Sequence, residues 1–223
     1  MKNINESKKK SRKQRETELR KQIILDAAET LFRTNGYENT TMDQIATQSE
    51  FSKGTLYNYF ASKDELYLAI ATKAYDLIIK YTKELTEKEE PGIEQLKAIG
   101  YAYYAFLKEY PKYAHIFHDI AIKVPSVNKK PENGLSSVEV EYLKKSNTYG
   151  KIFVSIITKA IESKQIRSDK NPLLIGIALS SLTNGLMKEI AQHQDNLQNY
   201  NVNSDEIVDF VFEMIGEGLK PRN

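Results

Sequence analysis

The chain has 223 residues, of which 40% are hydrophobic and 28% charged, and a formal net charge of +2. This length predicts a small module joined to a larger one, and the composition is that of a folded protein rather than a disordered one. The absence of cysteine excludes disulfides, thiolate metal sites and cysteine nucleophiles. No apolar run approaches the roughly 20 residues that cross a bilayer, and none follows the basic N-terminus as in a signal peptide. We therefore expect a soluble, cytoplasmic protein with no membrane partner.

Positive charge gathers at the N-terminus. Residues 1–21 contain nine lysines and arginines and three glutamates, a balance of +6, which leaves −4 for the rest of the chain. A cationic cluster gains affinity for phosphate by releasing condensed counterions, so a polyanion is one expected partner. A solvated tail is the other interpretation of such a run. We assign residues 1–17 as a basic flexible arm.

The first predicted helix covers residues 18–34, and Asn35-Gly36 supplies its end signal. Its apolar residues recur at helical spacing and are Leu19, Ile23, Ile24, Ala27, Ala28, Leu31 and Phe32. Residues 40–43, Thr-Thr-Met-Asp, are typical of an N-cap followed by an acidic third position. They predict a second, short helix.

That short helix is expected to end near Ser49, and another is expected to begin at Ser52. Residues 62–65, Ser-Lys-Asp-Glu, then form a capping box that opens a long helix running to about Lys88. Two short helices across a tight turn are the arrangement that places the second helix in the major groove of DNA.

Residues 52–60 have the chemistry of a DNA-reading helix. Gly54 lets a backbone approach a base edge or phosphate, whereas on a plain surface helix it would cost about 1 kcal/mol for no return. Ser52 and Thr55 carry short hydroxyls, Lys53 adds charge, and the Tyr57 phenol can reach a phosphate. Leu56 and Phe60 are assigned to the core. Taken singly, Ser52 is equally a helix cap, and Tyr57 and Tyr59 are equally packing aromatics.

Thr41 to Leu66 resembles the signature of tetracycline-repressor (TetR) family transcriptional regulators, without a gap in the spacing. The motifs that carry the likeness are Ile45-Ala46, Ser52-Lys53-Gly54-Thr55-Leu56-Tyr57, Phe60 and Lys63-Asp64-Glu65-Leu66. The resemblance implies phosphate contacts from Tyr57, from Lys63 and from Thr40 or Thr41. The full set expected to contact DNA is Thr40, Thr41, Ser52, Lys53, Gly54, Thr55, Tyr57, Asn58, Tyr59 and Lys63.

Two departures limit what the resemblance implies about the operator sequence. The turn reads Ser49-Glu50-Phe51 where the family commonly has an Ala-Gly-Val type, and Tyr59 stands where it often has histidine. Glu50 occupies a place that usually needs glycine, so it predicts a different turn conformation or backbone strain.

The remaining residues predict further helices and no strand. Pro91-Gly92 breaks the chain before a helix over 93–110, and Pro111 is placed to open another through Ile116, Phe117 and Ile120. A loop is expected over 125–134 and a turn over 167–172. The other predicted helices are 135–166, 173–194 and one that Ser204 caps. The expected fold is all-α with about nine helices, a count that the resemblance also implies.

The resemblance further implies that the last two helices pair with those of a second subunit. The corresponding face is Leu174, Ile177, Ser181, Gly185, Val208, Val211, Phe212 and Ile215. Small residues allow close helix approach and branched ones supply apolar area. The alternative is that the same stripe belongs to the core of a monomer. A protein that binds a palindromic site needs two DNA-binding domains at a fixed spacing to contact both half-sites. This requirement favours a homodimer.

Aromatic residues gather between Tyr101 and Phe117. The resemblance implies an inducer cavity in this region, and the candidates for its wall are Tyr103, Phe106, Leu107, Phe117, Tyr149 and Phe153. Such a stripe is often plain core, but buried tyrosine hydroxyls need partners and are consistent with an apolar pocket that has polar handles. We expect an amphipathic or aromatic small molecule.

Parts of the sequence are also compatible with two other functions. His115 and His118, with Asp119 beside them, have a spacing at which two ligands can share a metal, but no third ligand is apparent and no phosphate loop or nucleophile elbow is present. We therefore expect no enzyme, metal or cofactor. The second rival is a nonspecific nucleic-acid or anionic-membrane binder driven by the arm, whose affinity would be indifferent to DNA sequence.

The sequence thus predicts three parts: the arm over 1–17, a helix-turn-helix DNA-binding domain over 18–64, and a ligand-sensing and dimerisation domain over 65–223. The expected function is a ligand-responsive repressor that binds a palindromic operator as a dimer. Its inducer would change the angle of the helix that starts at Ser62 and so lower operator affinity. Activation in place of repression remains open at this point.

Overall fold

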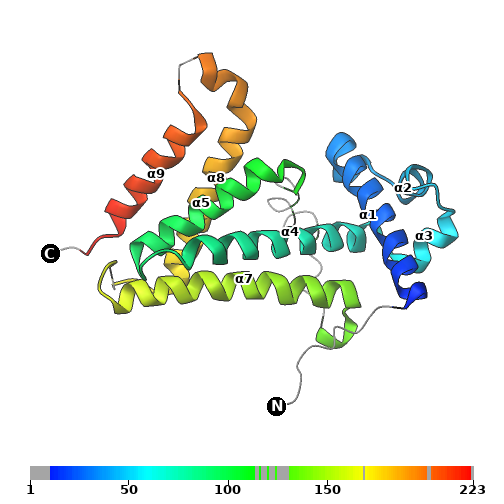
Figure 1. The fold of residues 1–223 in the computed structure, drawn as a ribbon, viewed down its shortest axis with the longest axis horizontal. Helices are drawn as coiled ribbons and strands as arrows, with labels where there is room; N and C mark the ends of the chain where they lie inside the picture. Colours follow the sequence, from blue (N-terminus) through cyan, green and yellow to red (C-terminus); the bar gives the residue numbers. More distant parts are fainter. Residues whose placement is uncertain are drawn as a thin grey trace. The chain divides into compact units, whose positions relative to one another are not determined.

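A computed structural model describes residues 11–113, 116, 120, 124, 131–167, 169–199 and 202–221. Its elements are α1 (Arg12–Asn39), α2 (Met42–Gln48), α3 (Lys53–Tyr59), α4 (Lys63–Thr86), α5 (Ile93–Glu109), the 3-10 turn η2 (Glu132–Gly134), α7 (Ser137–Glu162), α8 (Pro172–Asn199) and α9 (Ser204–Leu219) (Figure 1). The expected all-α fold of about nine helices is confirmed, since the described residues hold these eight α-helices, one 3-10 turn and no strand.

Helix α1 starts earlier than predicted. It begins at Arg12 because the Ser11 hydroxyl accepts from the Gln14 backbone N–H at 3.2 Å while the Gln14 side chain accepts from the Ser11 N–H at 2.8 Å. This capping box supplies an N-terminal signal that apolar spacing does not carry. The expectation of a flexible arm up to residue 17 is therefore wrong for residues 12–17, and residues 1–10 lie outside the described part.

Two predicted helix caps each move by one residue. Thr41 caps α2, with Gln44 rather than Asp43 closing the box. Asn203, and not Ser204, caps α9, because its side-chain oxygen accepts from the Glu206 N–H at 2.8 Å. Asn ranks with Ser as an N-cap, so sequence alone does not separate neighbouring candidates.

The chain divides into two compact units, residues 1–70 with 119–139, and residues 71–118 with 140–223. The boundary falls inside α4, whose residues Lys63–Ile70 belong to the first unit. The predicted helix-turn-helix domain, residues 18–64, lies within that unit. The division at residues 17 and 64 itself stays a prediction.

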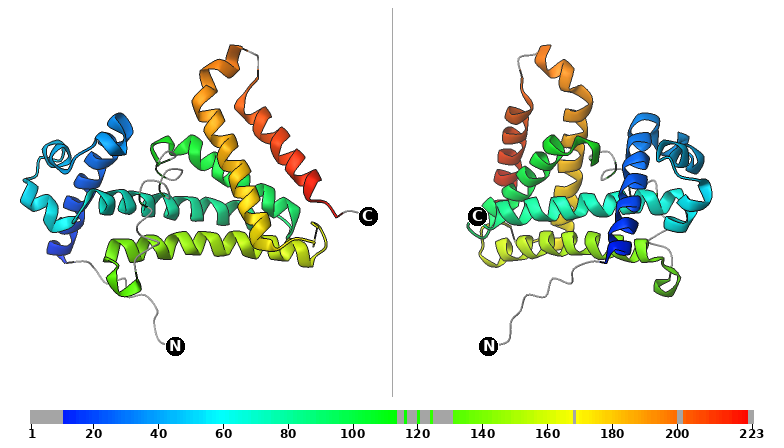
Figure 2. Two further views of the ribbon diagram at one scale, coloured as in Figure 1. Left: turned by 180° about the vertical axis from the view of Figure 1, so that it is seen from behind. Right: turned by 45° about the vertical axis from the view of Figure 1, so that its right-hand side comes forward.

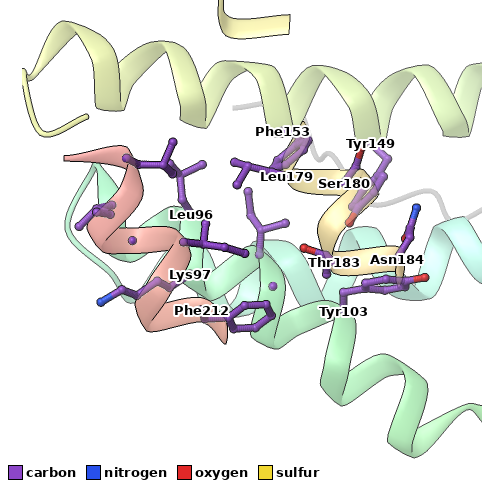
Figure 3. Close-up of a pocket in the computed structure, with 16 residues that line it drawn as sticks. Leu96, Lys97, Tyr103, Tyr149, Phe153, Leu179, Ser180, Thr183, Asn184 and Phe212 are labelled. Atoms are coloured by element: carbon purple, nitrogen blue, oxygen red, sulfur yellow. The ribbon is translucent and has the colours of Figure 1, made fainter. Parts of the chain in front are cut away.

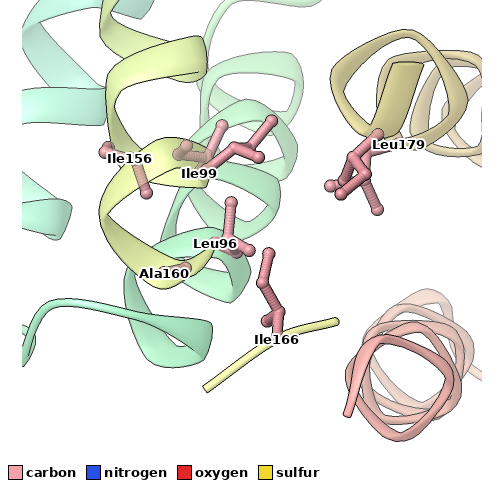
Figure 4. Packing of buried hydrophobic residues seen from close by; sticks show 8 residues of the cluster. Leu96, Ile99, Ile156, Ala160, Ile166 and Leu179 are labelled. Atoms are coloured by element: carbon pink, nitrogen blue, oxygen red, sulfur yellow. The ribbon is translucent and has the colours of Figure 1, made fainter. Parts of the chain in front are cut away.

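The second unit is built on a core shared by α5, α7 and α8. Its buried members are Leu96, Ile99, Ile156, Ile157, Ala160, Ile166, Ile175 and Leu179 (Figure 4). Gln165 helps to hold the start of α5, because its side chain accepts from the Ile93 N–H and donates to the Pro91 carbonyl. In both Figure 1 and Figure 2, α8 and α9 run side by side as a helical hairpin.

Helix α8 is unusually apolar for its exposure. By length and composition, Pro172–His193 is one described helix that could cross a membrane, but only 22% of that window is buried inside the chain. Length and composition alone do not distinguish a membrane-spanning helix from an apolar helix of a soluble protein. The exposed apolar side chains of α8 are considered with those of α9 below.

Candidate nucleic-acid interface and pocket

Helix α3 has one buried and one exposed side. Leu56 and Phe60 are almost fully buried, which confirms their assignment to the core. On the opposite side, Lys53, Gly54 and Asn58 are exposed and the Tyr57 ring is 44% exposed. The two apolar side chains anchor the helix from one side and leave its polar side exposed. Four of the residues expected to contact DNA, Lys53, Gly54, Tyr57 and Asn58, therefore lie on the exposed side of α3.

Ser52 has two hydrogen bonds at the start of this helix. Its hydroxyl accepts from the Thr55 N–H at 3.2 Å and lies 2.9 Å from the Thr55 hydroxyl. The cap interpretation of Ser52 is thus confirmed, and the side chain remains exposed beside Thr55. A cap that stays accessible is able to serve a ligand as well as the helix.

Gly54 has free space where a side chain would lie. A Cβ built at this position meets no atom within 4 Å, and the backbone is not in the left-handed region. Neither packing nor backbone conformation therefore requires glycine. Glycine costs a helix about 1 kcal/mol relative to alanine, and its open side would allow close approach by a group outside the chain.

The turn between α2 and α3 has the strain that the sequence predicts. Glu50 has a φ of 59°, in the region that L-residues other than glycine rarely adopt. The turn is closed by the Glu50 N–H donating to the Thr47 carbonyl at 3.1 Å and the Phe51 N–H donating to the Ala46 carbonyl at 3.0 Å. These bonds hold the strained residue and fix where α3 begins.

Thr40 and Thr41 have different surroundings. Thr40 is 1% exposed, and its hydroxyl donates to the Gly36 carbonyl at 2.7 Å, so it fastens the end of α1. Its expected DNA contact stays a prediction. Thr41 is exposed at the start of α2. Of the pair that the sequence could not separate, Thr41 is the accessible one.

Lys63 and Asp64 clamp Tyr37. The Lys63 ammonium donates to the Tyr37 carbonyl at 2.7 Å and lies 4.2 Å above the Tyr37 ring, while the Tyr37 hydroxyl donates to the Asp64 carboxylate. Burial, followed by the hydrogen bond to Asp64, raises the pKa of the Tyr37 phenol. Lys63 is therefore already engaged by the end of α1. Its expected phosphate contact stays a prediction.

Lys53 also has a partner. Its ammonium lies 2.6 Å from the Asp43 carboxylate, and that hydrogen bond raises the pKa of Lys53. Both side chains are more than half exposed, so the pair adds little stability and an incoming phosphate can compete for the lysine. Tyr59 is half-buried.

A partly open pocket of about 120 Å³ lies between α5, α7, α8 and α9 in the second unit (Figure 3). Its wall comprises Ile93, Leu96, Lys97, Ile99, Gly100, Tyr103, Tyr149, Phe153, Leu179, Ser180, Thr183, Asn184, Phe212, Ile215, Gly216 and Leu219. Most of these residues are apolar, which is usual for a small-molecule site.

Three of the residues predicted for the cavity wall, Tyr103, Tyr149 and Phe153, do line this pocket. Phe106 is fully buried in the core and Leu107 is half-buried, and neither lines it. Phe117 lies outside the described residues. Sequence reasoning missed Ser180, Thr183 and Asn184, although polar side chains in the otherwise apolar α8 were a signal.

Tyrosines continue from the pocket wall toward α4. The Tyr75 ring lies 6.0 Å from that of Tyr149 and 5.8 Å from that of Tyr142. Burial raises the pKa of Tyr149 to about 12, against a smaller opposing effect of the nearby Thr82 hydroxyl. That hydroxyl is buried and makes no hydrogen bond of ordinary geometry within the described residues. The phenols are therefore neutral at physiological pH.

The α8–α9 hairpin has an exposed apolar surface. Six large hydrophobic side chains are more than half exposed there, namely Leu173, Leu174, Ile177, Leu182, Phe210 and Met214. Of the predicted interface, Ser181 and Gly185 are exposed and Val211 and Ile215 half-buried. Val208 and Phe212 instead pack inside the subunit, where the Phe212 ring meets Tyr101 edge to face at 5.1 Å.

The described residues contain no group of three or more metal-ligating side chains. His115, His118 and Asp119, the candidates for a metal pair, lie outside the described part of the chain. His193 lies 3.4 Å from the Glu189 carboxylate on the exposed side of α8.

Residues 24–70 match the model of the tetR family of bacterial regulatory proteins. The chain is 32% identical over 122 residues to the uncharacterized HTH-type transcriptional regulator YhgD of Bacillus subtilis, covering 53% of this chain and 64% of YhgD. It is 31% identical over 111 residues to the HTH-type transcriptional activator FasR of Mycolicibacterium smegmatis, covering 49% and 50%. Both alignments span less than two thirds of the relative.

Solved structures extend the likeness in fold to nearly the whole chain. The transcriptional regulator FadR from Bacillus subtilis, solved in complex with stearoyl-CoA, matches with a TM-score of 0.66 over 89% of this chain and 98% of FadR. Sequence identity is 17%, so the match establishes a shared architecture and no shared ligand.

Proposed function

We propose that this chain, which belongs to the tetR family of bacterial regulatory proteins, is a cytoplasmic, ligand-responsive repressor that binds a palindromic operator as a homodimer. The observation that carries the DNA-binding part is the exposed face of α3, where Gly54 has open space beside Tyr57 while Leu56 and Phe60 hold the helix from behind. Nothing inside the described chain accounts for a glycine at that position.

In this proposal α3 enters the major groove. Gly54 lets the helix backbone approach the bases, and Lys53, Tyr57 and Asn58 lie on the same exposed face to contact bases and phosphates. Thr41 and Ser52 offer hydroxyls at the starts of α2 and α3. Thr55 and Tyr59, half-buried, contribute from the edge of that face.

The homodimer is supported by the exposed surface of the α8–α9 hairpin. Large apolar side chains that stay exposed on two neighbouring helices favour an interface with a partner. A second copy would cover Leu174, Ile177 and their exposed neighbours, with Phe210 and Met214 of α9 in place of the inward-facing Val208 and Phe212. Pairing through an isologous surface also supplies the twofold symmetry that a palindrome requires.

Response to a ligand is supported by the pocket and by the contacts of α4. At one end of α4, Lys63 and Asp64 hold Tyr37, and further along, Tyr75 touches the ring of the pocket-lining Tyr149. A ligand that prefers one position of α4 would change operator affinity through linkage. The stearoyl-CoA complex of FadR shows that a relative in fold accommodates a ligand with a long apolar part.

The test of DNA binding is titration of the full chain with duplexes from upstream of its own gene, followed by fluorescence anisotropy. Gly54→Ala is expected to weaken specific binding at least tenfold and Tyr57→Phe several-fold, because one fills the approach space and the other removes a phosphate donor. Matched controls in the second unit are Gly150→Ala, where an added Cβ also meets nothing within 4 Å, and Tyr101→Phe.

Specific binding that survives both substitutions in α3 would refute the assignment. Equal affinity for scrambled duplexes would favour the nonspecific binder that the basic arm allows. Whether the bound protein represses or activates is read from a reporter gene behind the same duplex. The relative FasR is named an activator, so both outcomes are informative.

A further inference from the structure

The pocket is polar at one end and apolar at the other. Figure 3 shows the side chains of Tyr103, Tyr149, Ser180, Thr183 and Asn184 gathered at the same end, where α5 and α7 meet α8. Toward the other end the wall is formed by Leu96 and further aliphatic residues of α5 and α9. A ligand that satisfies both ends must itself be polar at one end and apolar at the other.

The polar end has hydrogen-bonding capacity to spare. Among the residues that the structure describes, the side chains of Thr183 and Asn184 have no protein partner. The Asn184 amide can donate two hydrogen bonds and accept others, and the Thr183 hydroxyl can do both. These groups lie beside an apolar wall, where the local dielectric constant is lower than in water. A hydrogen bond from a ligand to Thr183 or Asn184 is therefore stronger there than at an open surface.

No charged group serves that end. Lys97 is the one charged residue of the wall, and its ammonium pairs with the Glu94 carboxylate at 3.0 Å and points away from the polar cluster in Figure 3. The wall includes no aspartate or glutamate. Burial raises the pKa of the Tyr103 and Tyr149 phenols, which keeps both uncharged. A charged ligand head at this end would meet uncharged groups and would have no counter-ion among the residues of the wall.

We propose that the pocket binds an uncharged amphipathic molecule, whose hydroxyl, carbonyl or amide end is held by Thr183, Asn184 and the two tyrosines and whose hydrocarbon part lies between α5, α7 and α9. The proposal rests on the ligand response proposed above, and it adds the chemical class of the ligand. It excludes free carboxylates and quaternary ammonium compounds as preferred ligands.

Three probes with the same ten-carbon chain separate the classes: decan-1-ol, decanoate and decyltrimethylammonium. Each is titrated into the full-length protein without DNA and followed by isothermal calorimetry and by the thermal unfolding midpoint. Decan-1-ol is expected to bind and to raise the midpoint, and at least tenfold more tightly than either charged probe. Equal or tighter binding of decanoate or of the ammonium compound overturns the proposal, and so does the absence of decan-1-ol binding.

Two substitutions locate the polar end. Thr183→Val and Asn184→Leu remove hydrogen-bonding groups from side chains that are not buried, so the fold is expected to persist. Far-ultraviolet circular dichroism checks this. Each is expected to weaken decan-1-ol binding about fivefold, the value of one hydrogen bond. The matched control is Thr148→Val in α7, which changes an exposed threonine outside the pocket wall and is expected to leave decan-1-ol binding unchanged. Unchanged affinity in both polar-end variants refutes the assigned orientation.

Failure here and failure of the DNA-binding proposal are distinguishable. Gly54→Ala lies in the first unit and leaves the pocket residues intact, so it is expected to bind decan-1-ol as the unchanged chain does. Probe binding without specific DNA binding would refute the regulator and leave the pocket assignment standing. DNA binding without probe binding would do the reverse.

Discussion

Tyr37 is the residue through which the first turn of α4 is fastened to the end of α1. Its hydroxyl reaches the Asp64 carboxylate, its carbonyl accepts from Lys63, and its ring lies edge-on to that of Tyr67 at 4.9 Å. Tyr67 in turn packs against Phe32 of α1 at 5.2 Å. The contacts combine a charge-assisted hydrogen bond, a cation over a ring and buried aromatic area. The Tyr37 side chain thus links the end of α1 to the first turn of α4 within the first unit.

Replacing Tyr37 with phenylalanine tests the polar part of this contact. The ring packing stays, but the Asp64 carboxylate loses its donor, so we expect a loss of about 1.5 kcal/mol in unfolding free energy. Urea unfolding followed by circular dichroism measures the change. Tyr57→Phe, which alters an exposed phenol, is the control and is expected to be neutral. Equal stability of the two variants would show that the Asp64 contact contributes nothing.

Asp205 joins α9 to α5. Its carboxylate accepts from the Tyr104 hydroxyl at 2.8 Å and from the Lys108 ammonium at 3.0 Å. These bonds, the first from Tyr104, hold the pKa of Asp205 below its ordinary value of 3.8. A carboxyl whose pKa is lower in the folded chain stabilises it at pH above about 4, and this contribution disappears as the pH falls through the folded-state value.

We therefore expect Asp205→Asn to be less stable than the unchanged chain at pH 6, with a difference that shrinks at pH 3 and below. Urea unfolding across that range measures it. Tyr104→Phe removes the first of the two donors, so the Asp205 carboxyl carbon should titrate at a higher pH in its nuclear magnetic resonance spectrum. A pH-independent difference would assign the role of Asp205 to helix capping or packing instead.

At the scale of elements, α5 and α9 meet through Gly100. A Cβ placed there would lie 2.5 Å from the Phe212 ring, which is too close for two non-bonded carbon atoms. The Phe212 ring is 4% exposed, so an added Cβ requires this buried ring to shift. Gly100 is therefore required by close packing, in contrast to Gly54.

Gly100→Ala is expected to destabilise the second unit by about 2 kcal/mol through overpacking, measured as a lower urea midpoint. Adding Phe212→Leu, which shortens the opposing side chain, should recover part of that loss. Gly150→Ala in α7 is the control, since its added methyl meets no atom and alanine favours a helix. If the double variant is no more stable than Gly100→Ala alone, the clash is not with Phe212.

How much the sequence predicts varies between elements in a physical way. The helices, the buried side of α3 and the strain at Glu50 follow from local rules, namely apolar spacing, caps and the cost of a positive φ. The inward turn of Phe212 does not, because α9 has apolar residues on two faces and only tertiary packing decides which one meets α5. Thr183 and Asn184 were not predicted for a related reason. A polar residue on a helix usually indicates exposure to solvent, and only the tertiary packing shows that these two line a pocket.

At the scale of the whole molecule, the exposed apolar side chains of α8 and α9 are the basis of the proposed homodimer. Ile177 is 56% exposed and lies among other large hydrophobic side chains of the hairpin, whereas Val140 of α7 is 49% exposed without belonging to that surface. Stable homodimer interfaces are rich in apolar residues at their centre, and a charge placed there is costly to desolvate. The two positions therefore form a matched pair for testing where a second copy binds.

We expect the unchanged chain, of 25.6 kDa, to run as a dimer in light scattering coupled to size-exclusion chromatography. Ile177→Glu should shift it to a monomer with the same helical circular dichroism, while Val140→Glu should remain dimeric. The monomer is also expected to bind an isolated half-site with nearly normal affinity but to lose its preference for the full palindrome, because only paired heads bind two half-sites at once. A dimer that persists in Ile177→Glu would assign the interface to another surface and leave the apolar α8 to a different partner.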